Sequence, residues 1–397
     1  MTSKIVQLLS DQHNPNLYIV DQILSNLGVA GIFALHATCR RLRWLIHHMT
    51  ESPHLLNINK HLKRFSNNPT RFRYELGKCD GLIAGSFVRN FLTFSSPASA
   101  RLTIFIDGMK DYNFLRYLAK YEGYGEYTER RQTYLTTHKT HSDVSILIRA
   151  RSRPIIDIIN RAKTSADLMF ISWNKFYCLF PLPTIKWHKV FVLGPFDDYM
   201  DITLRKYATS GWTTIWPDEA PELVPQGALQ QISGQESLII NFGNSPRGKF
   251  TPDCVLENGI FSIGWAAQDY DGHPRLAVGT LPMDRDPALR YIHTTGCIGM
   301  PQASWIGFLT TKLRHWEYLE IMKMDPDARS DCFFLPNRPV MGNWRDCLTY
   351  IQFYMMPTWD YADEHISTWF REWRKQETKL ALLPPAPDYR SAVQQTI

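Results

Sequence analysis

The sequence predicts an α+β protein with a helical N-terminal head, an α/β middle region and an aromatic-rich C-terminal region. Two patterns support this. From Leu17 to about His48, large aliphatic residues recur mostly three or four positions apart, which is the spacing of amphipathic helices. Between residues 72 and 183, strand-like runs at 101–107 and 143–149 alternate with helical runs such as 112–121. That alternation is typical of a mixed sheet flanked by helices.

The bulk composition is that of a folded protein, since 44% of the residues are hydrophobic and 21% are charged. The formal net charge of +6 is spread over 397 residues in short basic runs, so it does not favour nucleic acid as a partner. The seven cysteines are scattered without a CxxC pair, which predicts free thiols in a reducing compartment and no metal site. We see no signal-peptide core and no stretch long enough to span a membrane, so we expect a cytoplasmic or nuclear protein.

Turn-forming residues divide the chain into five expected parts. Helices interrupted at Gly28 and Gly31 occupy residues 1–50, and a basic linker helix region punctuated by prolines covers 51–78. The α/β region spans 79–184, a C-terminal α+β region spans 185–383, and a proline-containing tail covers 384–397. In the C-terminal region we expect strands at 260–265 and 276–281, and then helices whose aromatic stripes form core.

The segment LYIVDQILSNLGVAGIFALHATCRRLRWLIHH ends in a TCRRLR run at 38–43. It resembles the F-box, a helical motif that docks on the Skp1 adaptor of ubiquitin ligases. It departs from the motif at Asn16 and Tyr18, where a proline and an acidic residue are common. The resemblance implies a partner-binding face built from Leu17, Ile23, Leu24, Leu27, Leu35, Cys39, Leu42 and Leu45. A plain helical bundle is the alternative interpretation.

A second set of landmarks consists of the turn GLIAGS at 81–86, the strand at 101–106 and the apolar strand at 144–148. Their order resembles fungal proteins that combine an F-box-like start with a nucleotidyltransferase-like domain. In active nucleotidyltransferases a Gly-Ser turn holds the nucleotide phosphates, and two acids one residue apart on the next strand bind magnesium. Here Gly85 and Ser86 are present, but Arg101 and Thr103 stand where those acids would be, and arginine cannot ligate a cation. The resemblance therefore implies a pseudoenzyme without catalytic residues, metal or cofactor.

Two further possibilities concern this region. Gly85, Ser86 and Arg101 are candidates for an anion site that would bind nucleotide weakly. Asp107, Asp111 and Asp143 are alternative acids for a nucleotide-binding or nucleotidyl-transferring enzyme, although turn and capping roles are commoner at such positions.

The function that the sequence favours is a non-catalytic interaction protein. The head would bind a Skp1-like adaptor, and the remainder would select an unknown target protein for the ligase. A stand-alone interaction protein with a relic F-box is the other non-enzymatic interpretation.

Overall fold

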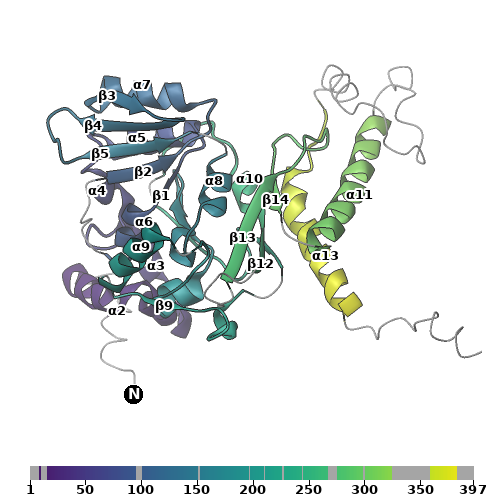
Figure 1. Cartoon of the computed structure of the whole chain (residues 1–397), viewed down its shortest axis with the longest axis horizontal. Coiled ribbons are helices and arrows are strands. Elements are labelled where there is room, and N and C mark those ends of the chain that lie inside the picture. The colour runs from purple at the N-terminus through teal and green to yellow at the C-terminus, as the bar shows by residue number, and fades with distance from the viewer. Residues whose placement is uncertain are drawn as a thin grey trace, which may run out of the picture. The chain divides into compact units, whose positions relative to one another are not determined.

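The computed structural model describes residue 9 and residues 16–94, 101–150, 153–195, 197–209, 211–225, 228–243, 245–266, 275–297, 300–323 and 358–381. The protein is α+β, as predicted. It divides into two compact units, one made of residues 1–282 and 294–298 and the other of residues 283–293 and 299–397 (Figure 1). Each unit is described by itself.

An eight-stranded sheet forms the centre of the first unit, with strand order β11-β7-β6-β1-β2-β5-β4-β3. The strands are β1 (Leu82–Ala84), β2 (Arg101–Phe105), β3 (Tyr124–Glu129), β4 (Thr133–His138), β5 (Ser145–Arg149), β6 (Met169–Ile171), β7 (Lys175–Cys178) and β11 (Leu238–Asn241). β2 and β5 run parallel, with Thr103 opposite Leu147, and the other neighbours run antiparallel. The strands predicted near 101–107 and 143–149 are therefore confirmed, and they are direct neighbours.

Two smaller sheets also lie in this unit. One has the order β10 (Leu229–Gln231), β12 (Ile260–Ala266), β13 (Arg275–Pro282), β14 (Thr294–Gly296), and the other pairs β8 (Lys189–Phe191) with β9 (Thr213–Ile215). The strands predicted at 260–265 and 276–281 are β12 and β13, an antiparallel pair. Helix α8 (Pro154–Asn160) is held to β13 by two hydrogen bonds, since Asn160 Nδ2 donates to the Thr280 carbonyl at 2.9 Å and Asn160 Oδ1 accepts from the Thr280 amide at 2.8 Å.

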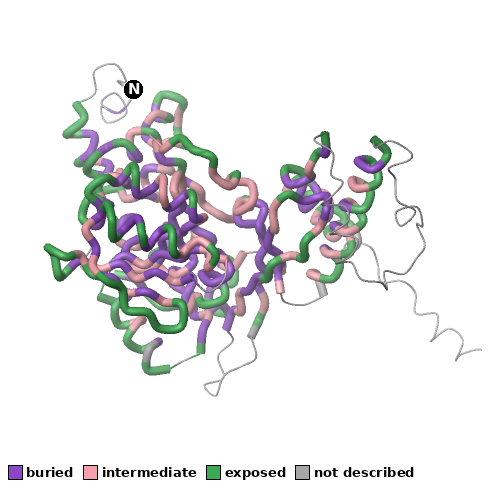
Figure 2. The backbone as a smooth tube through the Cα atoms, turned by 90° about the horizontal axis from the view of Figure 1, so that it is seen from above, coloured by how far each residue is buried: buried purple, intermediate pink, exposed green. Residues whose placement is uncertain are grey.

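The N-terminal helices and the large sheet share one hydrophobic core, which Figure 2 shows as buried backbone running through this unit. The helical segments of the unit besides α8 are α2 (Leu17–Thr38), η1 (Arg40–Leu42), α3 (Trp44–Glu51), α4 (Ile58–Leu62), α5 (Pro69–Lys78), α6 (Ser86–Leu92), α7 (Asp111–Tyr121), η2 (Ser165–Asp167), η3 (Leu182–Lys186), α9 (Asp198–Thr209), η4 (Pro221–Leu223) and α10 (Asp253–Glu257). Leu24 of α2, Phe72 of α5 and Ile104 of β2 belong to the same cluster of buried side chains. The expected boundary at residue 50 therefore does not separate two cores.

Residues 51–78, which we expected to be a linker, are tied into this core by buried charged groups. The Arg73 side chain is buried, and its Nε donates to the Trp173 carbonyl at 2.7 Å. Burial lowers the pKa of the Arg73 guanidinium to about 10. The buried Glu122 carboxylate accepts from Ser66 Oγ at 2.8 Å and from the Asn67 amide at 2.6 Å. This segment is part of the folded unit and not a spacer.

The second unit contains α11 (Met300–Met322), η7 (Asp363–His365) and α13 (Ile366–Ala381). Trp305 of α11 packs against Phe370 and Trp373 of α13, with ring centroids 5.1 and 5.7 Å apart. The aromatic stripes are therefore core, as predicted. The buried Asp363 carboxylate lies 2.9 Å from Nε2 of the fully buried His293. The tail expected at 384–397 lies outside the described residues.

Candidate functional site

Helix α2 is bent in the middle, and the bend determines which side chains it exposes. The helix starts at an N-cap, because Asn16 Oδ1 accepts from the Ile19 amide at 3.3 Å. At Gly28 the backbone has φ 64° and ψ 175°, a non-helical conformation that favours glycine. The element is therefore two shorter helices joined at Gly28. The break predicted at Gly28 is confirmed, whereas the one predicted at Gly31 is wrong because Gly31 stays helical.

One row of α2 is built into the core. Val20 and Leu24, four residues apart, are fully buried. Asp21 on the same side is also buried, and its Oδ2 accepts from Ser52 Oγ at 2.7 Å. The other carboxylate oxygen lies 2.6 Å from Nε2 of His48 on α3. These contacts fix the orientation of α2 about its axis.

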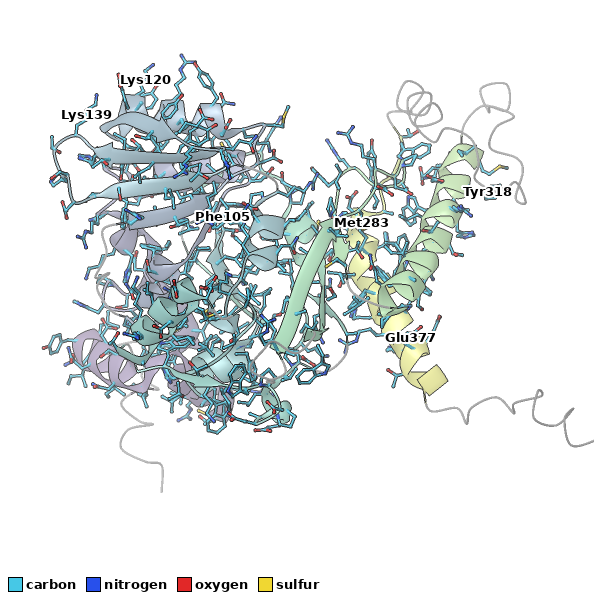
Figure 3. All side chains as sticks on the ribbon, in the orientation of Figure 1. Phe105, Lys120, Lys139, Met283, Tyr318 and Glu377 are labelled. Carbon is cyan, nitrogen blue, oxygen red and sulfur yellow. The ribbon has the colours of Figure 1, made fainter. Side chains whose placement is uncertain are left out.

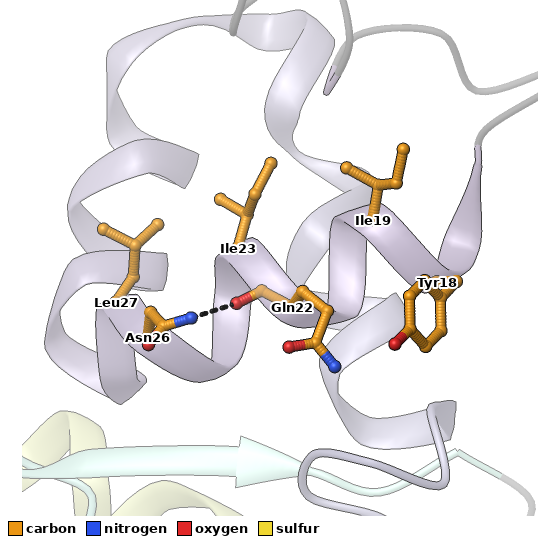
Figure 4. Close-up of a pocket in the computed structure, with 6 residues that line it drawn as sticks. All are labelled: Tyr18, Ile19, Gln22, Ile23, Asn26 and Leu27. Carbon is orange, nitrogen blue, oxygen red and sulfur yellow. Dashed lines mark hydrogen bonds between the residues drawn. The ribbon is translucent and has the colours of Figure 1, made fainter.

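Next to this buried row, α2 carries an apolar row that is partly open to solvent. Ile19, Ile23 and Leu27 follow one another at intervals of four residues, and the exposed fractions of Ile19 and Leu27 are 40% and 42%. A parallel row of uncharged polar residues, Tyr18, Gln22 and Asn26, runs beside it. The six side chains, all from this one helix, line a shallow and largely open hollow of about 430 Å³, which we call the α2 groove (Figure 4).

The groove carries no formal charge, but a basic run follows it in the chain. Between Leu17 and Thr38 the only acidic residue is Asp21, which is buried and engaged by His48 and Ser52. Just beyond the helix, Arg40, Arg41 and Arg43 are exposed.

The residues predicted for the partner-binding face are partly buried and partly exposed in the structure. Leu24, Leu42 and Leu45 are fully buried, so they cannot contact a partner, and this part of the prediction is corrected. They are buried because the helices first fill their own core. Leu17 and Leu27 are exposed, whereas Ile23, Leu35 and Cys39 are half-buried. Sequence reasoning missed Tyr18 and Ile19, although the spacing 19, 23, 27 was visible in the sequence.

The Gly-Ser turn lies beside the strand position where a nucleotidyltransferase would carry its acids. Gly85 joins β1 to α6 with φ +85°, and a Cβ added there would lie 3.9 Å from Thr103 Oγ1. Ser86 begins α6, and Arg101 is exposed at the start of β2. The three residues named for an anion site thus come from adjacent elements, while anion binding itself stays a prediction.

The three alternative acids do not converge. Asp107 Oδ1 accepts from the Met109 amide at 3.0 Å, Asp111 Oδ2 accepts from Tyr134 Oη at 2.8 Å, and Asp143 pairs with Arg64 at 3.2 Å. Because β2 and β5 are parallel, Asp107 after β2 and Asp143 before β5 lie at opposite ends of strands that pair over roughly 13 Å. In the part of the chain that the structure describes, no group of three or more His, Cys, Asp or Glu residues could hold a metal ion. Asp107 and Asp143 are therefore too far apart to bind the same metal ion.

Helix α2 also corrects our expectation about membrane spans. Within the described residues it is the one helix whose length and mean hydropathy, 1.5, satisfy the requirements for crossing a bilayer. Its break at Gly28 leaves segments 17–27 and 29–38, each shorter than the roughly 20 residues that a span needs. Its inner row is, in addition, already buried in protein core.

We compared the chain with protein-family models, with curated proteins and with solved structures, and none of the three comparisons gave a match. The functional argument therefore depends on the groove and on the resemblances in the sequence.

Proposed function

We propose that this protein is a non-catalytic substrate-recognition adaptor whose α2 groove binds a Skp1-type partner in the cytoplasm or nucleus. The observation that carries the proposal is the apolar row on α2 in which Ile19 and Leu27 are exposed and Ile23 is half-buried, next to a row that is locked into the core. Because the helix cannot rotate to bury both rows, the outer row is available to a partner. Amphipathic helical surfaces of this kind are a common mode of protein recognition.

The exposed apolar surface of the row is too small to account for specific binding by itself. Full burial of an aliphatic side chain stabilises by about 1.5–3 kcal/mol, so covering the exposed 40% of Ile19 and 42% of Leu27 contributes roughly 2 kcal/mol together. That is well below the free energy of a micromolar complex, about 8 kcal/mol. Further contacts from the polar row and from the basic run at 40–43 are needed for specific binding.

The choice of a Skp1-type partner comes from the resemblance of residues 17–48 to the F-box. Two short helices joined at Gly28, followed by the TCRRLR run, agree with that resemblance in order and spacing. The basic run would contribute electrostatic steering to an acidic partner and would make association dependent on salt.

The rest of the first unit is proposed to act in recognition and not in catalysis. Arg101 and Thr103 stand at the positions where a nucleotidyltransferase-like domain would need magnesium ligands, and a guanidinium would repel the metal. The target protein would be bound outside the α2 groove, which the adaptor occupies.

Co-purification with a Skp1-type adaptor tests the proposal. The variant is Ile19→Asp combined with Leu27→Asp, which places two charges on the groove without touching the buried row. The matched control is Tyr112→Asp, because Tyr112 is an exposed aromatic residue on α7. The adaptor should co-purify with the parent and the control but not with the double variant. Equal recovery with all three, at equal melting temperatures, would contradict the proposal.

A further inference from the structure

The turn between β4 and β5 places two histidine rings against each other. His138 ends β4, and His141 lies three residues later, in the turn that Figure 3 marks with Lys139. The ring centroids are 4.9 Å apart, and the two Nδ1 atoms are 3.2 Å apart. Thr140 Oγ1 lies 3.0 Å from Nδ1 of His138 and 2.9 Å from Nδ1 of His141. Three donor atoms therefore form a nearly equilateral triangle.

The backbone holds this triangle in place. The His138 amide donates to the Val144 carbonyl at 2.9 Å, the Val144 amide donates to the His141 carbonyl at 2.9 Å, and the Lys139 amide donates to the Gly123 carbonyl at 3.0 Å. The His138 ring packs edge-on against the buried Tyr124 ring at 5.3 Å. The turn backbone and the His138 ring are therefore held in place before any ligand arrives.

One hydrogen bond shows where a ring lone pair points. The backbone amide of Thr140 donates to His138 Nδ1 at 3.3 Å. Because that amide always carries its proton, the nitrogen accepts, and its single lone pair is directed toward the Thr140 amide, so a bound ion would replace this hydrogen bond. His141 Nδ1, only 3.2 Å away, faces the same space. Without a ligand, the proton between the two nitrogens is therefore on His141 Nδ1, which donates to His138 Nδ1.

The dimensions of the triangle match one face of a metal coordination shell. Imidazole nitrogens lie about 2.0–2.1 Å from a bound divalent transition ion, so two that subtend 90–109° at the metal are about 2.9–3.4 Å apart. The three observed edges of 2.9, 3.0 and 3.2 Å fall within this range. Since His141 and Thr140 are exposed, water can fill the remaining coordination positions.

We propose that His138 and His141, with the Thr140 hydroxyl, form a two-histidine clamp for a divalent transition ion of the Cu²⁺ or Ni²⁺ type. Two imidazoles and oxygen ligands with open positions suit the tetragonal or octahedral geometry of these ions. Binding moves the proton between the rings from Nδ1 to Nε2 of the same imidazole, so the neutral ligands require no net charge change. Copper should bind more tightly than nickel or zinc.

Titration of the full chain with Cu²⁺ at neutral pH, followed by calorimetry and electron paramagnetic resonance, tests the proposal. The exposed ring of His141 is replaced first, as His141→Gln, because that change spares the contact between His138 and Tyr124. The matched control is His54→Gln, which removes an exposed imidazole on a different element. Loss of a residue that only orients a metal ligand lowers metal affinity on the order of 10- to 100-fold. Loss of a ligand itself should therefore weaken Cu²⁺ binding by at least about tenfold.

The parent and the control should show one ion with two nitrogen ligands, and His141→Gln should show one nitrogen ligand or none. Equal affinity of the parent and His141→Gln, or an equal loss in His54→Gln, would mean adventitious surface binding only and would overturn the proposal.

Discussion

Alanine substitution of Leu24 and of Leu27, one at a time, separates the core row of α2 from its docking row. The two leucines are three residues apart on the same helix, but Leu24 is fully buried whereas 42% of Leu27 is exposed. They therefore differ in surroundings and not in chemistry. A change that distinguishes them tests the assignment of the two rows.

The expected magnitudes follow from burial. Leu24→Ala removes a fully buried side chain and leaves a cavity, which costs about 2.7–5 kcal/mol of unfolding free energy. Leu27→Ala removes roughly three methylene equivalents at about 0.8 kcal/mol each from a side chain that is 58% buried, because 100 − 42 = 58. The expected loss is about 1.4 kcal/mol, with no closed cavity added. Leu24→Ala should therefore be roughly two to four times as destabilising.

Urea denaturation of both variants gives the two unfolding free energies, and calorimetry with a Skp1-type adaptor gives their affinities. Leu27→Ala should lower the affinity, whereas Leu24→Ala should leave it unchanged in protein that is still folded. Equal losses of stability, or weaker adaptor binding by Leu24→Ala alone, would refute the assignment of the rows.

Other properties of the chain lead to three predictions. Burial, and then the neighbouring Asp286 carboxylate, raise the pKa of Glu317 to about 8. Because the folded state holds this proton more tightly, the second unit should lose stability as the pH rises from 4.5 through about 8, and Glu317→Gln should remove that dependence in melting followed by tryptophan fluorescence. Gly77→Ala would place a Cβ 2.9 Å from the Phe250 ring, so we expect a loss of about 1–3 kcal/mol in urea denaturation. Nucleotide-transfer assays with magnesium or manganese should show no turnover above a heat-killed control, and activity abolished by Asp143→Asn would show that the acids act after all.

The sequence predicted the elements better than the boundaries between folded units. Period and turn signals were sufficient for the break at Gly28, for the two strands β2 and β5, and for the aromatic stripes of α11 and α13. They did not show that β2 and β5 are neighbours in the sheet. They were not sufficient for residues 51–78, because nothing local shows that Arg73 reaches the Trp173 carbonyl a hundred positions away. Long-range hydrogen bonds of this kind decide which segments share a core.

The candidate site shows the same limit on a smaller scale. The four-residue spacing on α2 is identical for Val20 with Leu24 and for Ile19 with Ile23, so periodicity alone could not tell the inner row from the outer one. The contacts of Asp21 with His48 and Ser52 decide the orientation, and they depend on how α3 folds back on α2. The triangle at His138, Thr140 and His141 likewise depends on the backbone of a turn, which spacing does not reveal.

The most direct test of the central claim is calorimetric titration of the full chain with a purified Skp1-type adaptor at several temperatures. The account predicts a one-to-one complex with a negative heat-capacity change, because apolar surface on α2 is buried, and it predicts loss of that complex in the Ile19→Asp, Leu27→Asp double variant. Absence of binding by the parent chain, or an unchanged complex with the folded double variant, would contradict it.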